Sequence, residues 1–161
     1  MKNLKKIFTV AIALACTVVM AACGGSSEGK NLSAEQIANE IKASYKTDTE
    51  LIGLTDNTLS NYYDIDDEDV AEYKVYTSTA FTSEEIAVFK ASSSDKVKGI
   101  NEAANERKEE IIDNFEDYIP EQYELAKENT KIVSKGEYVL LVTGEKANVD
   151  KAVEVFEKLL K

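Results

Sequence analysis

The chain has 161 residues, of which 43% are hydrophobic and 30% are charged, and its net charge is −11 at pH 7. This length and composition suit a single domain with one core. Because the sequence contains no histidine, Ser-His-Asp and Cys-His catalysis and histidine zinc sites are excluded, and an acidic surface repels nucleic-acid phosphates and anionic lipid headgroups.

The first 22 residues have the three parts of a secretory signal peptide. Lys2, Lys5 and Lys6 form a basic start, residues 7–20 carry no charge, and two alanines follow. The uncharged run is shorter than the roughly 20 apolar residues that span a bilayer comfortably. We therefore expect a signal peptide over residues 1–22 rather than a permanent transmembrane helix.

The end of this segment resembles the lipobox of bacterial lipoproteins, in which small residues precede a cysteine that receives lipid. The residues in question are Met20-Ala21-Ala22-Cys23. The resemblance implies a diacylglyceryl group on the Cys23 sulfur, and two acyl chains such as palmitate anchor a protein stably where one chain is marginal. Cys16 also follows small residues, but it would leave a very short apolar run before it, so we predict lipid on Cys23.

Residues 23–31 are rich in glycine and serine and are predicted to be a flexible linker. Residues 32–161 are predicted to form one domain. Removal of residues 1–22, which hold three lysines and no acid, changes the net charge from −11 to −14. We expect this acidic domain on the extracytoplasmic face of the cell membrane, with no thiol left for a disulfide or a nucleophile.

The first half of the domain is predicted to contain a helix and two strands. Ser33 and Gln36 have the spacing of a capping box, which predicts a helix over residues 33–46. A short helix is plausible at residues 57–62. Alternating and β-branched residues then predict strands over 72–78 and 84–91.

The second half is predicted to contain two helices, a hairpin and a closing helix. Residues 92–95 are expected to cap a long helix that reaches residue 116, and Pro120 to begin the next one. Residues 131–143 then suggest a hairpin whose second strand, the most apolar in the chain, is expected to be central. Asn148 is expected to cap the last helix. This order predicts an α+β fold, with about four antiparallel strands and helices packed on one face of the sheet.

From residue 53 to the end, the chain resembles a family of Gram-positive lipoproteins that carry a domain of unknown function. The resemblance is an ordered set of short segments rather than a single motif. They are Tyr62-Tyr63-Asp64-Ile65, Val75-Tyr76-Thr77-Ser78, Glu84 to Lys90, Tyr118-Ile119-Pro120-Glu121 and Gly136-Glu137-Tyr138-Val139. The family has no assigned activity, so the resemblance implies class and location and no catalytic residue.

Two groups of carboxylates are candidates for chemistry. Alternate acids at Asp64, Asp66 and Glu68 resemble the start of a calcium loop, but the glycine and the bidentate glutamate of such a loop are missing, which favours a plain acidic loop. Glu84 and Glu85 precede a strand and are the least arbitrary pair for glycosidic hydrolysis. An edge-strand role, or a salt bridge with Lys90 or Arg107, is the preferred interpretation of that pair.

The tyrosines could line a groove for a carbohydrate or a peptide, although half-buried packing is the preferred interpretation. Six of them lie in or near predicted strands and helix ends, namely Tyr62, Tyr63, Tyr73, Tyr76, Tyr118 and Tyr138. We expect no cofactor. The leading hypothesis is a non-enzymatic, lipid-anchored module that binds or scaffolds an envelope protein or polymer; the alternative is a carboxylate-dependent hydrolase that acts on envelope polymers.

Overall fold

Five antiparallel strands form one sheet in the order β1-β2-β3-β5-β4. The structure is a computed structural model that describes residues 31–55 and 60–161. Its elements, in chain order, are α1 (Ala34–Ser44), β1 (Leu51–Gly53), β2 (Val70–Ser78), β3 (Glu85–Ala91), α3 (Val97–Glu116), α4 (Pro120–Asn129), β4 (Lys131–Lys135), β5 (Tyr138–Thr143) and α5 (Lys146–Leu159). The predicted α+β class is confirmed, and one strand, the three-residue β1, was not expected.

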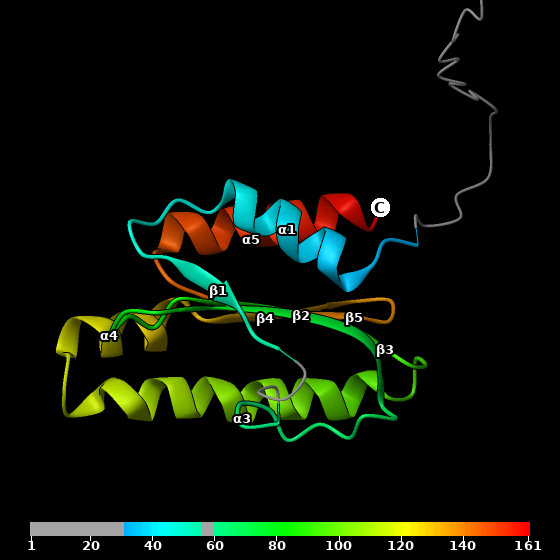
Figure 1. Cartoon of the computed structure of the whole chain (residues 1–161), viewed down its shortest axis with the longest axis horizontal. Helices are drawn as coiled ribbons and strands as arrows, with labels where there is room; N and C mark the ends of the chain where they lie inside the picture. Colours follow the sequence, from blue (N-terminus) through cyan, green and yellow to red (C-terminus); the bar gives the residue numbers. More distant parts are fainter. Residues whose placement is uncertain (1–30, 56–59) are drawn as a thin grey trace, which may run out of the picture.

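Helices cover both faces of the sheet, with α1 and α5 on one face and α3 and α4 on the other (Figure 1). The expectation of helices on one face only was wrong. The physical reason lies in β3 and β5, whose side chains are almost all buried. Successive side chains of a strand point to opposite faces, so a continuous apolar strand needs cover on both sides. The most apolar strand, β5, lies inside the sheet between β3 and β4, and β3 is the middle strand.

The first helix forms where the sequence predicts it. Ser33 accepts a hydrogen bond from the Gln36 backbone, and the Gln36 side chain accepts one from the Ser33 backbone, so the capping box is confirmed. Ile37 and Ile41 are fully buried against the sheet. The predicted hairpin is also confirmed, because β4 and β5 pair across Gly136, which has a φ of 59°.

Two predicted helix caps were wrong. The cap residue of α3 is Lys96, and the cluster at residues 92–95 forms the preceding turn, in which the Lys96 amide donates to the Ser93 carbonyl. The cap residue of α5 is Glu145. The Asn148 side chain instead exchanges two hydrogen bonds with the backbone of Lys46, of 3.0 and 2.6 Å, and so joins the start of α5 to the segment after α1. Of the helix expected at 57–62, residues 56–59 lie outside the described residues and 60–62 form a turn.

Candidate functional site

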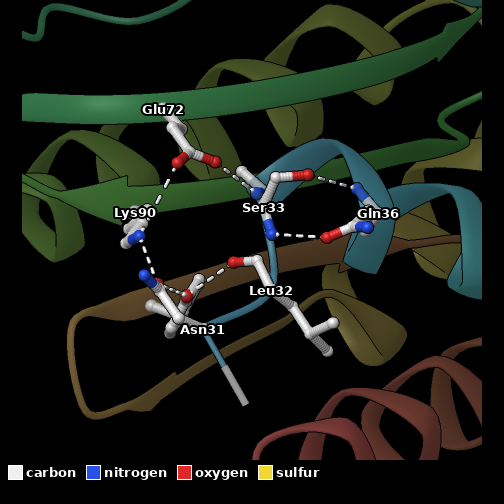
Figure 2. A network of polar contacts seen from close by, with 8 residues as sticks. Asn31, Leu32, Ser33, Gln36, Glu72 and Lys90 are labelled. Carbon is white, nitrogen blue, oxygen red and sulfur yellow. Dashed lines mark hydrogen bonds and ion pairs between the residues drawn. The ribbon is translucent and has the colours of Figure 1, made fainter. Parts of the chain in front are cut away.

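The chain reaches the domain through a polar network at one end of the sheet (Figure 2). Lys90, at the end of β3, donates to the Asn31 side chain over 2.7 Å, and the Tyr138 hydroxyl donates to the Leu32 carbonyl over 2.6 Å. The predicted signal peptide, the predicted lipid site at Cys23 and the linker up to residue 30 lie outside the described residues. We call this region, where residues 31–33 contact β3 and β5, the proximal end.

The same network holds the first turn of α1. Glu72 accepts a hydrogen bond of 3.0 Å from the Ala34 amide and lies 3.6 Å from the Lys90 ammonium. Its negative charge faces the positive end of the helix dipole, which is the favourable orientation. The network joins α1, β2, β3 and β5, so the direction from which the chain reaches the domain is fixed. The sequence alone gives no signal for these contacts, because they depend on which strands are neighbours.

Four loops gather at the opposite end of the molecule, which we call the distal end: residues 45–50, 79–84, 117–119 and 144–145 (Figure 1). Ser83 donates from its amide and its hydroxyl to the Gln122 side chain, over 2.8 and 3.1 Å, and so joins the β2–β3 loop to α4. Lys90 and Ser83 are separated by seven residues of nearly extended chain, or about 23 Å. The distal end therefore lies about the length of the sheet away from the proximal end.

Glu85 is buried in a structural ion pair on the α3 side of the sheet. Its carboxylate accepts hydrogen bonds from Arg107 over 2.7 and 3.2 Å and from the Tyr63 hydroxyl over 2.5 Å. Glu85 is 1% exposed and Arg107 is 9% exposed. The sequence predicted either an edge-strand role for Glu84 and Glu85 or a salt bridge with Lys90 or Arg107, and of these the Glu85–Arg107 pair is present.

The partners of this ion pair have shifted acidities. Burial, and then the charge of Glu85, raise the pKa of the Tyr63 hydroxyl well above its ordinary value of 10.0. Burial lowers the pKa of Arg107, but the hydrogen bond and charge of Glu85 outweigh this effect and raise it above the ordinary value. Because both Glu85 oxygens are occupied by these partners, the carboxylate is committed to holding α3 on the sheet.

Glu84 lies among hydroxyl groups and has different partners from Glu85, although both residues line one small cavity beside α3. Its Oε2 accepts hydrogen bonds from Thr47 over 2.8 Å, from Thr82 over 3.2 Å, and from Thr49. Glu84 is only 8% exposed. Because both oxygens of Glu85 are engaged by Arg107 and Tyr63, Glu85 is not free to act with Glu84 as a hydrolytic pair.

The acidic segment after Tyr63 is a solvated loop. Asp64, Asp66 and Glu68 are exposed. Within residues 31–55 and 60–161, no three acidic side chains converge closely enough to hold a metal ion. Asp69, which follows them, pairs with Lys96 over 2.5 Å at the start of α3. These residues therefore form a plain acidic loop, which is the interpretation preferred from the sequence.

Of the six tyrosines considered for a groove, five pack against the core, which agrees with the preferred interpretation of half-buried packing. Tyr76 and Tyr138 belong to the cluster under α1 and α5, and Tyr62, Tyr63 and Tyr73 to the cluster under α3 and α4. Because these clusters lie on opposite faces of the sheet, the five rings do not form one groove.

Tyr118 is the exception, since 86% of it is exposed. Phe81 is exposed to the same extent, and the sequence did not single it out. Phe81 lies on the β2–β3 loop and Tyr118 on the turn between α3 and α4, so both rings are at the distal end. An exposed aromatic ring stands out only once the surrounding structure has placed it in solvent.

The described part of the chain is thus an α+β domain with helices on both faces of one antiparallel sheet. None of its helices has the length and apolar character needed to span a bilayer. Residues 43–144 match the sequence model of a family described as a domain of unknown function, DUF4358. Because the match spans more than half of the chain, the protein belongs to this family. The searches of curated proteins and of solved structures returned no match. The predicted domain of unknown function is confirmed, and the lipoprotein and Gram-positive origin stay predictions.

Proposed function

We propose that the protein is a membrane-anchored lipoprotein of the cell envelope whose domain binds an extracytoplasmic partner. The observation that supports this most directly is the position of the proximal end. Asn31 and Leu32 are held at one end of the sheet, only eight residues after Cys23. A lipid on Cys23 would therefore keep the proximal end near the membrane and leave the distal end free.

The reach of the linker supports this orientation. A glycine- and serine-rich linker behaves as a flexible coil whose ends lie about 5–6 Å times the square root of its length apart, which is roughly 15 Å for this segment. That span is shorter than the sheet itself. The acidic surface and anionic headgroups repel each other, which also favours a domain that stands off the membrane.

Binding is favoured over hydrolysis because the carboxylates selected for hydrolysis are already engaged. Glu85 neutralises Arg107 and accepts from Tyr63, and Glu84 accepts hydrogen bonds from threonine hydroxyls. The sequence contains no histidine to act as an alternative general base.

The anchor is tested by expressing the full chain in a bacterium that processes lipoproteins and feeding a fatty acid with a clickable group. We expect labelling of the native chain, no labelling of Cys23→Ser, and undiminished labelling of Cys16→Ser, which is the matched control. Protease added to intact protoplasts should digest the domain. Labelling that survives in Cys23→Ser, or a domain protected from the protease, would refute the proposal.

A further inference from the structure

The distal end carries two solvent-exposed aromatic rings on neighbouring loops. Phe81 and Tyr118 are each 86% exposed, and the only other exposed large apolar side chain among the described residues is Ile52, at 44%. The Ser83–Gln122 hydrogen bonds hold the two loops together. Exposed aromatic rings on a rigid support are typical of binding surfaces, because a ring contributes much contact area at a small loss of side-chain entropy.

Tyr118 lies within an acidic stretch of the chain. Between Lys108 and Lys127 the chain has no basic residue and seven exposed acids. These are Glu109, Glu110, Asp113, Glu116, Asp117, Glu121 and Glu124. Glu110 pairs with Arg107, and the remainder extend along the end of α3 and the start of α4.

The arrangement of these acids opposes the stability of α3. Glu116 is the last residue of the helix and Asp117 is its cap, and the last turn contains no basic residue. Negative charges at the C-terminal end of a helix interact unfavourably with its dipole. Positions that break a local stability rule without local compensation are expected at functional sites.

A second buried carboxylate lies at the same end. Glu84 is 8% exposed, and in the described part of the chain it accepts hydrogen bonds from the hydroxyls of Thr47, Thr49 and Thr82. Acidic side chains are almost never this buried unless they are paired. Glu84 lines a small cavity of about 120 Å³ together with the Glu85–Arg107 ion pair and with Asn114 and Phe115 at the end of α3.

We propose that the distal end docks a lysine- or arginine-rich segment of a partner protein, with the Phe81 and Tyr118 rings and the acids of residues 109–124 as its recognition surface. Arginine and lysine favour the faces of aromatic rings and pair with carboxylates, so this one chemistry satisfies both features. A second copy of the chain would bring the same negative charge and be repelled, as would nucleic acid. The outward orientation rests on the proposed function, whereas the binding chemistry does not.

The test uses the full chain purified in neutral detergent and a fluorescent peptide of alternating arginine and glycine. The same peptide with citrulline in place of arginine is the neutral control. We expect anisotropy to report binding of the arginine peptide that weakens steeply as salt rises, because salt screens exposed charges. Equal binding of the citrulline peptide, or binding insensitive to salt, would overturn the proposal in favour of a neutral ligand such as a polysaccharide.

Matched variants locate the surface. Phe81→Ala and Tyr118→Ala should each weaken binding about two- to fivefold, whereas Ile52→Ala, which shortens an exposed apolar side chain on β1, should leave it unchanged. The double variant Glu116→Gln/Asp117→Asn should weaken binding more than Asp66→Asn/Asp67→Asn, which removes two exposed acids outside the distal end. Equal effects from the two double variants, or no effect from either ring, would contradict this assignment.

The two proposals fail separately. Cys23→Ser should bind the arginine peptide as the native chain does while losing its lipid label. If the native chain is labelled but does not bind the peptide, the docking surface is wrong and the anchor stands; if it binds without being labelled, the reverse holds.

Discussion

Replacing Arg107 by methionine should be among the most destabilising single changes in the domain. Methionine keeps most of the length and apolar volume of the side chain but leaves the Glu85 charge buried, 1% exposed, with only the Tyr63 hydroxyl as a donor. Breaking a buried ion pair by removing one partner costs about 3–5 kcal/mol. We expect the free energy of unfolding at pH 7, measured by urea titration with an unchanged slope, to fall by that amount.

Two comparisons test the physical cause of this loss. In Glu85→Gln/Arg107→Met the buried charge is gone and the amide oxygen can still accept from Tyr63, so stability should recover by about 2 kcal/mol or more. Lys151→Met breaks an exposed pair of 2.9 Å with Glu154 and should cost at most about 1 kcal/mol. A double variant no more stable than Arg107→Met would refute an uncompensated charge as the cause.

Four further predictions follow from local geometry. Gly144 has a φ of 145°, and a Cβ there would lie 1.6 Å from the Tyr45 hydroxyl. Gly144→Ala should therefore lower the free energy of unfolding, measured by thermal denaturation, by about 2 kcal/mol or more. Adding Tyr45→Phe, which removes the clashing oxygen, should restore part of this loss. Ser33→Ala removes the capping oxygen of α1 and should lower the free energy of unfolding by about 1 kcal/mol. An unchanged free energy of unfolding would contradict this. Asp117→Asn should raise the melting temperature, because it removes an unfavourable interaction of about 0.3–1 kcal/mol between the Asp117 charge and the α3 dipole. A lower melting temperature would contradict this. The pKa of the Tyr63 hydroxyl is raised in the folded state, so its contribution to stability is complete below pH 10 and is lost as the pH rises above 10. Tyr63→Phe should therefore flatten the fall in the free energy of unfolding that urea titration shows between pH 9 and 11.

Features specified by residues close in sequence were predicted correctly. The capping box needs only Ser33 and Gln36, three positions apart, and the hairpin needs the strands on either side of Gly136. The helix that begins at Pro120 likewise follows from one residue whose backbone suits the first helical turn. These elements keep their predicted type because local and tertiary preferences agree.

Features that depend on contacts distant in sequence were missed or left open. Asn148 has the composition of a helix cap, but a partner 102 positions away, Lys46, takes both of its hydrogen-bonding groups. The second helical layer was missed because an apolar strand such as β5 can be buried on one face or on both until the crossing helices are placed. The salt bridge was predicted as a choice between Lys90 and Arg107, and only the fold, which puts α3 against Glu85, decides between them.

The candidate surface shows the same limit more strongly. The acids near the end of α3 are visible in the sequence as part of a charged helix face, but Phe81 and Tyr118 resemble ordinary core residues. Their exposure of 86% depends on how the fold places the β2–β3 loop and the turn between α3 and α4. The sequence could therefore supply the charge of the distal end but not its aromatic component.

Intact mass spectrometry of the native product tests the central claim most directly. We expect a chain that begins at Cys23 and carries the added mass of a diacylglyceryl group on its sulfur. A product that retains residues 1–22 with an unmodified Cys23 would contradict the anchor, the location and the orientation of the distal end together.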